Sequence, residues 1–171
     1  MPDSLRAVVK HYGRVPHFKR TWEAPGAKVR ELQRVAGGNL GGVGLIWART
    51  GRVILLRHEP GRGWGGEWVA PGGGALPEES PEETFAREAR EEVGLGIRIL
   101  DLTRTFDLTV TDGDAVARGF LFQFEAMALS GDAFPGTGIE EIRWFDELPE
   151  DMAFRQDYAE AFRRRRPTFD P

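Results

Sequence analysis

The sequence contains no cysteine. This absence excludes disulfide bonds, thiolate catalysis and a zinc site built from cysteine ligands. The sequence also lacks a run of about 18 uninterrupted apolar residues, so it offers no candidate for a membrane-spanning helix. The first residues have no apolar core of the kind found in signal peptides. We therefore expect a protein that does not contact membranes and is cytoplasmic.

Positive charge is not in excess either. The 23 Lys and Arg residues are outnumbered by 27 Asp and Glu residues, which gives a net charge of −4. Such a chain has no general attraction for nucleic acid, and an anionic substrate needs a local cation or a metal ion. The basic run Arg163–Arg166 has two interpretations. It could complement the dipole at a helix end, which we favour, or contact RNA phosphate.

The length of 171 residues predicts one domain with a sizeable core. We expect residues 1–36 to form an N-terminal extension and residues 37–171 to form the main domain. Within the extension, residues 5–12 alternate enough for a strand and residues 25–35 fit a helix. The glycine-rich stretch 37–44 could cradle phosphate, but no Gly-Lys-Ser/Thr follows it, so a flexible bend is favoured.

The rest of the chain alternates strand-like segments with two helices. Strands are predicted at residues 43–49, 52–58, 67–70, 97–110, 115–129 and 142–145, and helices at residues 81–93 and 152–166. The first of these helices has a strong start signal, with Ser80 as N-cap, Pro81 at the first helical position and Glu83 completing a capping box. This mixed order of strands and flanking helices favours an α/β sandwich.

Three carboxylates crowd one turn of that helix. With helical positions advancing about 100° each, Glu88, Glu91 and Glu92 fall within an arc of roughly 100°. Like charges so close repel one another. A divalent cation would reverse this cost, since hard oxygen ligands suit Mg²⁺ or Mn²⁺. An apolar stripe beside the arc places these carboxylates at the edge of the buried face, which favours a metal site over a solvated helix surface.

These residues resemble the signature of the Nudix hydrolase family, G-x5-E-x7-R-E-U-x-E-E-x-G-U, in which U is aliphatic. Every fixed position is matched at the required spacing, by Gly73, Glu79, Arg87, Glu88, Glu91, Glu92, Gly94 and Leu95. The lead-in from Trp68 and the later segment 140–145 are also similar to the family pattern, so the likeness covers roughly residues 40 to 150. It implies a Nudix-type α/β/α sandwich with a mixed β-sheet flanked by helices.

The resemblance also implies the chemistry, which is metal-dependent hydrolysis of a nucleoside diphosphate linked to another moiety. Glu88, Glu91 and Glu92 are the implied ligands of Mg²⁺ or Mn²⁺, together with the main-chain carbonyl of Gly72. The cation would neutralise phosphate oxygens and lower the pKa of a bound water.

Supporting roles follow from the same likeness. Arg87 and Glu79 are expected to pair and to orient the helix against the preceding loop. A helical pair between Glu83 and Arg87 is the alternative. The general base is open between Glu88 and an acid of the later segment, either Glu140 or Glu141.

Binding residues outside the signature are less defined. Trp64, in a glycine-rich loop, is the aromatic residue best placed to stack on a base. Arg57, His58 and Arg62 could meet phosphates, although a surface role is favoured for each.

The substrate and the competing functions stay open at this point. A nucleotide sugar such as ADP-ribose and a nucleoside triphosphate are both compatible with the signature. The proline and tyrosine that accompany some substrate preferences are absent after it. A non-catalytic nucleotide-sensing or protein-interaction module is the alternative function, but such relatives usually lose signature acids. The related isopentenyl diphosphate isomerases need a cysteine. A homodimer formed through the N-terminal residues is a further arrangement to consider.

Overall fold

The computed structural model describes residues 3–62, 64 and 66–165. The chain divides into two compact units. The first contains the described residues up to Val43, together with Gly73–Phe85 and Asp101–Phe124. The second contains Gly44–Gly72, Ala86–Leu100 and the described residues from Glu125 onward. No helix in the described ranges is long and apolar enough to cross a membrane.

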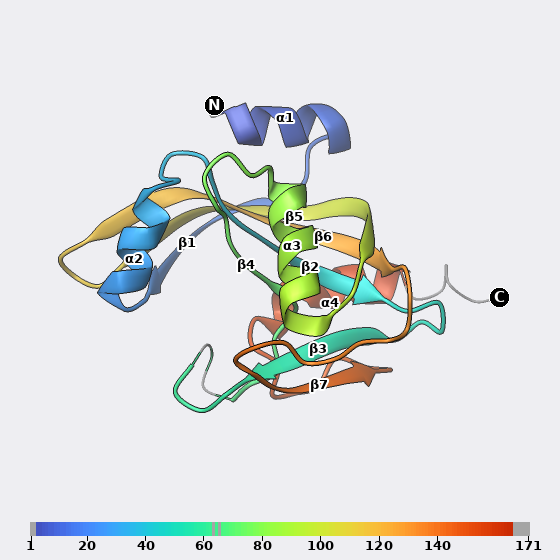
Figure 1. Cartoon of the computed structure of the whole chain (residues 1–171). Coiled ribbons are helices and arrows are strands. Elements are labelled where there is room, and N and C mark those ends of the chain that lie inside the picture. Colours follow the sequence, from blue (N-terminus) through green and yellow to red (C-terminus); the bar gives the residue numbers. More distant parts are fainter. Residues whose placement is uncertain (1–2, 63, 65, 166–171) are drawn as a thin grey trace. The chain divides into compact units, whose positions relative to one another are not determined.

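Helices flank a mixed β-sheet, as the sequence predicts (Figure 1). The elements in chain order are α1 (Asp3–Tyr12), β1 (His17–Glu23), α2 (Gly26–Gln33), β2 (Asn39–Trp47), β3 (Val53–His58), β4 (Gly72–Gly74), α3 (Pro81–Val93), β5 (Ile97–Thr111), β6 (Val116–Ala128), β7 (Ile139–Phe145) and α4 (Arg155–Arg165). Strands β2, β5 and β6 and helix α3 contribute residues to both units.

The first unit has the strand order β1-β5-β6-β2, with β4 pairing with β2. Strand β1 runs parallel to β5, with His17 opposite Thr105. Helix α2 begins after Pro25, close to the predicted start. Its Val29 and Leu32 are buried against Phe106 of β5 and further apolar residues of β2 and β6. The apolar face of α2 therefore covers this part of the sheet.

The prediction of a strand at residues 5–12 is wrong, because these residues belong to helix α1. Val8 is its buried residue. The ring of Tyr12 meets Phe124 of β6 edge-on, with centroids 5.9 Å apart. Burial, followed by the charge of Glu82 and a hydrogen bond to it, raises the pKa of Tyr12 to about 12. These contacts attach α1 to the body of the first unit.

The glycine-rich stretch 37–44 is also not the bend that the sequence suggested, since β2 begins at Asn39 and runs through it. A Cβ atom on Gly41 would lie 2.5 Å from the carbonyl oxygen of Gly73, and one on Gly42 would lie 2.6 Å from that of Pro81. Real Cβ atoms essentially never come that close. Glycine is therefore needed here because other backbone segments pack directly against the strand.

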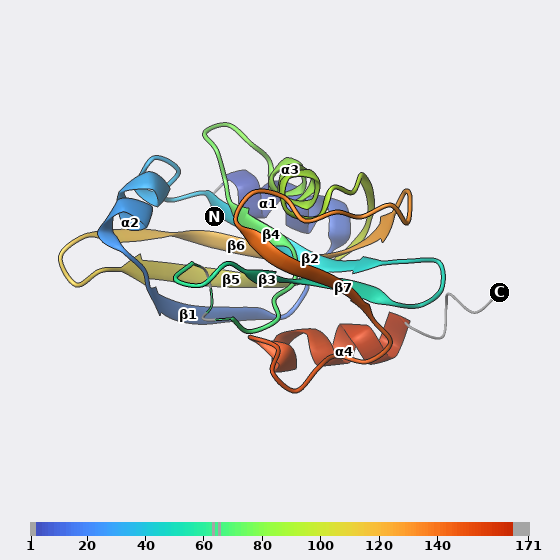
Figure 2. The same ribbon diagram turned by 60° about the horizontal axis from the view of Figure 1, so that its bottom comes forward.

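The second unit has the order β2-β3-β7. Strand β3 is antiparallel to both neighbours, with Val53 opposite Trp47 on one side and Phe145 on the other. The predicted strand at residues 67–70 is reduced to two isolated bridges, at Trp68 and Val69. Figure 2 shows α4 and β7 from below.

Helix α4 begins at Arg155, three residues later than predicted. Its Phe162 stacks on Trp47, with ring centroids 5.2 Å apart. Arg165 donates a hydrogen bond of 2.8 Å to the fully buried carboxylate of Glu125. This arginine of the basic run therefore has a structural partner, while Arg166 lies outside the described residues.

Candidate functional site

Helix α3 carries the predicted carboxylates, and both of its ends are fixed by local sequence. At the start, the Ser80 N–H donates to Glu83 Oε2 at 2.8 Å, and the Glu83 N–H donates to Ser80 Oγ at 3.1 Å. This is the reciprocal capping box expected from the sequence. At the end, Gly94 has φ 70, and the N–H of Leu95 donates to the carbonyl of Ala89. The N–H of that left-handed glycine also donates a 5→1 bond of 3.1 Å to the carbonyl of Arg90, which forms an αL C-cap.

A loop of the second unit, residues 130–138, holds the last turn of α3. The Phe134 N–H donates to the carbonyl of Val93 and the Gly136 N–H donates to that of Glu92, at 3.1 and 3.0 Å. A Cβ on Gly136 would lie only 1.7 Å from the Glu91 carbonyl oxygen. No other residue fits there without backbone movement, so the loop and the glutamate-bearing turn are locked together.

Arg87 binds two of the three predicted ligands. Its Nη1 atom lies 3.0 Å from Glu88 Oε1 and 3.1 Å from Glu91 Oε2. Glu91 is the most exposed of the signature glutamates, whereas the Glu88 side chain is largely buried. The guanidinium thus offsets part of the repulsion between neighbouring carboxylates.

Glu92 is the most buried of the three, with 8% of the residue exposed. Its Oε1 atom accepts a 2.7 Å hydrogen bond from the N–H of Gly72. Burial and, after it, the charges of Glu88 and Glu91 raise the pKa of Glu92 to about 8, although the hydrogen bond from Gly72 and the charge of Arg87 act in the opposite direction. Negative charge at this carboxylate is therefore poorly compensated by the protein.

Gly72 itself needs to be glycine, because its φ of 151 lies outside the range that other residues adopt readily. This conformation brings its N–H to Glu92 and places the backbone of the residue beside the carboxylate. The expectation that its carbonyl binds the metal stays a prediction.

His58, at the end of β3, lies beside Glu92, although the sequence favours a surface role for it. Its Nε2 atom lies 4.0 Å from Glu92 Oε2, and most of its side chain is buried. Burial, followed by the nearby charge of Arg62, lowers the pKa of His58. Because the pKa of Glu92 is raised at the same time, both groups favour their neutral forms at pH 7. The contact is a close approach of two titratable groups and not an ion pair.

Glu141, a predicted base, is held by arginines on the surface of the second unit. Arg57 lies 3.6 Å from Glu141 and 3.2 Å from Asp151, and Arg143 donates a hydrogen bond to Glu141. The Arg57 guanidinium also stacks on Trp68, 4.3 Å from the ring centre. These contacts give Glu141 a structural role whether or not it takes part in catalysis.

Three other predicted residues occupy defined places. Glu140 is exposed on β7. Glu79 accepts hydrogen bonds from the Leu76 N–H and the Thr84 hydroxyl in the first unit, at 2.7 and 3.2 Å. Its pairing with Arg87 stays a prediction. Trp64 is 38% exposed and meets Phe154 edge-on at 4.9 Å.

The donor set of α3 fits a divalent cation in its chemistry. It supplies three carboxylates on one turn, beside the backbone of Gly72, and Glu92 carries uncompensated charge when ionised. In the described part of the chain, no three His, Asp or Glu side chains are already gathered around one point. Arg87 engages Glu88 and Glu91 instead. Cation binding therefore requires these side chains to change partners.

Comparison with known proteins identifies the family and the fold of the chain. The model of the NUDIX domain matches residues 40–165. An RNA pyrophosphohydrolase of Gluconacetobacter diazotrophicus is 40% identical over 118 residues, which cover 63% of this chain and 69% of that protein. An uncharacterised Nudix hydrolase of Bacillus subtilis is 34% identical over 99 residues, or 57% of this chain. The chain spans 61% of the length of that second relative.

Solved structures show the same fold. A NUDIX hydrolase from Nitrosomonas europaea superposes with a TM-score of 0.56 at 25% identity, over 76% of this chain and 74% of the other. An ADP-ribose pyrophosphatase from Streptococcus suis gives 0.55 at 16% identity, over 77% and 91%. The expected α/β sandwich with a mixed sheet is thereby confirmed. With the domain match over most of its length, the chain belongs to the Nudix hydrolase family.

Proposed function

We propose that this chain hydrolyses the phosphoanhydride bond of a nucleoside diphosphate linked to another moiety, with a divalent cation held by α3. Members of the family generally use divalent metal ions. The observation that carries the proposal is the turn with Glu88, Glu91 and Glu92, in which Glu92 is buried beside Gly72 and has a pKa raised to about 8. A buried carboxylate in this state gains most from a cationic partner.

The three glutamates would hold Mg²⁺ or Mn²⁺, and the carbonyl of Gly72 would complete the protein ligands. Such a cation supplies charge neutralisation on the phosphate oxygens and a more acidic bound water. Loop 130–138 holds the last turn of α3 through the Glu92 carbonyl, so it fixes the direction of the Glu92 side chain. Precise placement of ligands by their surroundings is worth about 10–100-fold in metal affinity.

Arg87 is a positioning residue in this proposal. In the cation-free chain its guanidinium binds Glu88 and Glu91. When those carboxylates turn to a cation, Arg87 would pair with Glu79, as the sequence predicts. The pairing would tie the helix to the loop that precedes it.

We propose that one of three glutamates is the base that accepts a proton from the attacking water. Glu88 is our first candidate, because its largely buried side chain lies on the same turn as Glu92. Glu140 and Glu141 are the alternatives. Glu141 would have to leave the arginines that hold it, which makes it the less favourable of the two.

The substrate is proposed to be a nucleotide with an accessible diphosphate. Similarity to an RNA pyrophosphohydrolase supports cleavage of a pyrophosphate bond, and the two candidate substrates are a nucleoside triphosphate and a nucleotide sugar such as ADP-ribose. We infer that Trp64 stacks on the base, because 38% of it is exposed and an edge-on contact with Phe154 supports the ring. Base stacking of this kind contributes about 1–3 kcal/mol. A cytoplasmic location and a homodimer stay predictions from the sequence.

The decisive experiment is a substrate panel with Mg²⁺ or Mn²⁺ and product identification. Glu88→Gln and Glu92→Gln should each lower kcat/KM by about 100-fold or more, as expected for groups that stabilise the transition state. Glu160→Gln, an exposed substitution on α4, is the control and should leave turnover unchanged. Equal turnover in all variants would refute the assignment of the metal site.

The same panel tests the alternative of a nucleotide-sensing module. A sensor would bind one of the nucleotides without releasing product. All signature acids are present in this chain, so we expect turnover. Binding without hydrolysis across the panel would favour the sensor.

A further inference from the structure

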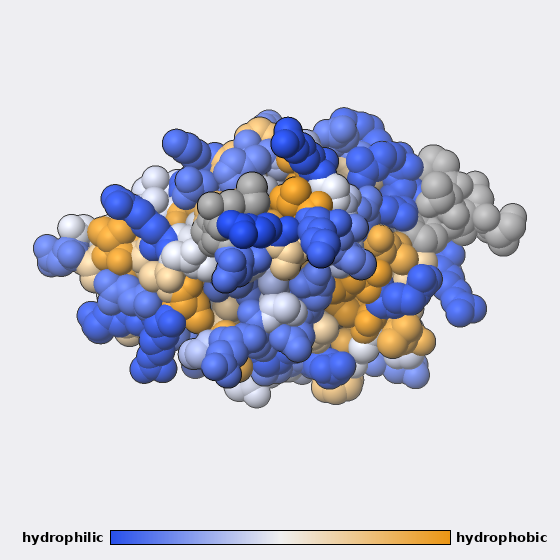
Figure 3. Space-filling view, turned by 90° about the horizontal axis from the view of Figure 1, so that it is seen from above, coloured by the Kyte–Doolittle hydropathy of each residue, from blue (hydrophilic) through white to orange (hydrophobic). Residues whose placement is uncertain are grey.

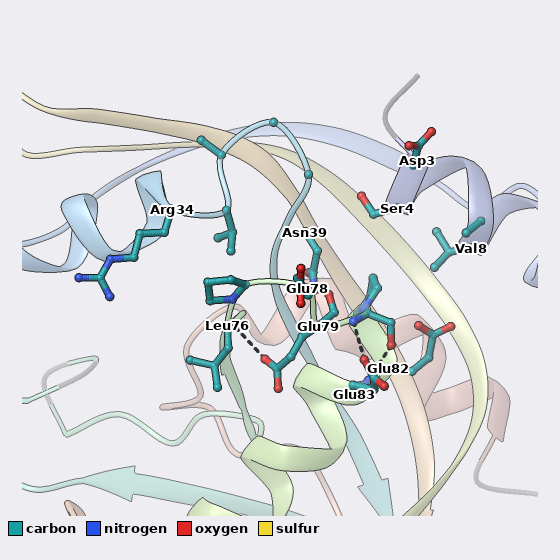
Figure 4. Close-up of a pocket in the computed structure, with 18 of the residues that line it drawn as sticks. Asp3, Ser4, Val8, Arg34, Asn39, Leu76, Glu78, Glu79, Glu82 and Glu83 are labelled. Atoms are coloured by element: carbon teal, nitrogen blue, oxygen red, sulfur yellow. Dashed lines mark hydrogen bonds between the residues drawn. The ribbon is translucent and has the colours of Figure 1, made fainter.

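The first unit contains a pocket of about 910 Å³ that includes none of the proposed metal ligands and shares Glu79 with the proposed supporting residues. It is lined by α1, by residues 34–39 before and at the start of β2, and by residues 76–83 before and at the start of α3. Figure 4 shows residues from these three segments around it. Hydrophilic side chains predominate on the face that carries α1 (Figure 3).

The pocket is strongly acidic. Its carboxylates are Asp3, Glu78, Glu79, Glu82 and Glu83. Among the described residues of the lining, Arg34 is the one permanent cation, and His11 lines the pocket as well. Without counting His11, these described residues carry an excess of four negative charges.

Three of the carboxylates are occupied by local hydrogen bonds, and one of these three, Glu82, accepts from the Tyr12 hydroxyl. Glu79 accepts from the Leu76 N–H and Glu83 from the Ser80 N–H, at 2.7 and 2.8 Å. Asp3 and Glu78 lie exposed at the pocket. Their charges are therefore available to a ligand.

An unsatisfied buried amide provides independent evidence for a ligand. Asn39 lines the pocket and is only 7% exposed. Its Nδ2 atom donates to the carbonyl of Glu79 and to the hydroxyl of Thr84, both at 3.1 Å. Its Oδ1 atom accepts no hydrogen bond from the described residues. A buried acceptor left in this state is unfavourable, and a donor from a ligand would remove that cost.

A second unsatisfied oxygen lies on the wall formed by α1. Ser4 Oγ is buried and has no hydrogen-bond partner among the described residues. It faces the start of β2, 3.8 Å from where a Cβ on Gly38 would lie. Ser4 and Asn39 thus bring oxygen atoms without partners to the same pocket from two different elements (Figure 4).

The positive ends of two helices do not make this an anion site. Helices α1 and α3 both begin at the pocket, but each has acidic residues in its first turn, Asp3 in α1 and Glu82 and Glu83 in α3. These carboxylates offset the helix dipoles. The capping box also occupies the N–H of Glu83. A phosphate would meet the excess negative charge of the lining.

We propose that this pocket binds a small organic polyamine. An ammonium group would donate hydrogen bonds to Asn39 Oδ1 and Ser4 Oγ, and a further ammonium group would lie near Asp3 and Glu78. Ammonium groups carry three donors and no acceptor, which matches a lining rich in acceptors. This site is separate from the glutamates proposed to hold the metal ion, so its ligand does not depend on hydrolysis.

The test is calorimetric titration of the full chain with the triamine spermidine, in buffer of about 20 mM salt so that screening is weak. The double variant Asp3→Asn/Glu78→Gln should weaken binding about tenfold or more, since two charge contacts are lost. The matched control Glu23→Gln/Asp114→Asn removes the same charge from exposed positions of the first unit outside the pocket. It should change the dissociation constant by less than about twofold, because charges outside the pocket lie farther from its ligand and act on it more weakly.

Two single variants test the site in the same titration. Ser4→Ala should leave the fold intact, as it removes a buried oxygen that has no partner, and should still weaken spermidine binding. Glu88→Gln should bind spermidine like the parent chain. Loss of binding in Glu88→Gln, equal loss in the control double variant, tighter binding of inorganic phosphate than of spermidine, or no binding at all would each overturn the proposal.

Discussion

Glu92→Gln should stabilise the cation-free protein while it lowers activity. The glutamate has an ordinary pKa of 4.5 and a pKa of about 8 in the folded chain. Below pH 4.5 the carboxyl is protonated in both the folded and the unfolded chain, so its burial costs no charge and folding stability is at its highest for this group. As the pH rises from 4.5 to 8, the unfolded chain releases the proton and the folded chain keeps it, so folding stability falls.

The size of the effect follows from the same values. Each pH unit between the two pKa values corresponds to about 1.4 kcal/mol. At pH 7 the free energy of unfolding is therefore about 3 kcal/mol lower with Glu92 than with a similar side chain that cannot ionise. Glutamine cannot ionise, and its side-chain oxygen can still accept the hydrogen bond from Gly72. For a chain of this length, 3 kcal/mol corresponds to roughly 6–12 °C in Tm.

The assay is thermal unfolding of the parent and Glu92→Gln proteins at several pH values from 4.5 to 8, with a metal chelator present. The variant should gain most at the high end of this range and nothing at the low end. Adding Mg²⁺ should raise the Tm of the parent more than that of the variant, because a cation stabilises the ionised carboxylate. A difference in Tm that does not change with pH would refute the burial argument.

Three further substitutions test the architecture by chemical denaturation. Gly42→Ala should destabilise by about 1–3 kcal/mol, since its Cβ would lie 2.6 Å from the Pro81 carbonyl oxygen; unchanged stability would contradict the close packing. Ser80→Ala removes the side-chain cap of α3 and should cost about 1 kcal/mol, whereas Ser80→Asp should keep the cap. Arg165→Ala leaves the buried Glu125 without its arginine and should cost about 3 kcal/mol, with an exposed arginine of the same helix, Arg163→Ala, as the control expected to change little.

Local signals explain which elements could be predicted from the sequence. The start of α3 is determined by side chains that bond to their own backbone three residues away, and the observed bonds between Ser80 and Glu83 match the expected pattern. The carboxylate turn follows from that start by helix geometry alone. Glycine at position 94, with φ 70, ends the helix for an equally local reason.

Helix α1 was missed because two periodicities compete in its short sequence. Val8 and Val9 are β-branched and suit a strand. Leu5, Val8, Val9 and Tyr12 are also spaced as i, i+3, i+4 and i+7, which is one face of a helix. The second pattern prevails in the structure, where Val8 is buried and Tyr12 packs on Phe124. Tertiary contacts decide between patterns that are nearly equal locally.

His58 and Gly42 show what no local pattern contains. His58 reaches Glu92 because β3 ends where the last turn of α3 lies, and residues 34 positions apart carry no sequence mark of that approach. Gly42 resembles a bend residue in sequence, yet it lies inside β2. It must be glycine because the backbone of α3 leaves no room for a side chain. A glycine in a sequence indicates either a backbone conformation that other residues avoid or a lack of room for a side chain. Only the position of the neighbouring backbone distinguishes these two cases. Close backbone contacts of this kind leave no local sequence pattern, and contacts of loop 130–138 likewise hold the last turn of α3 with its glutamates.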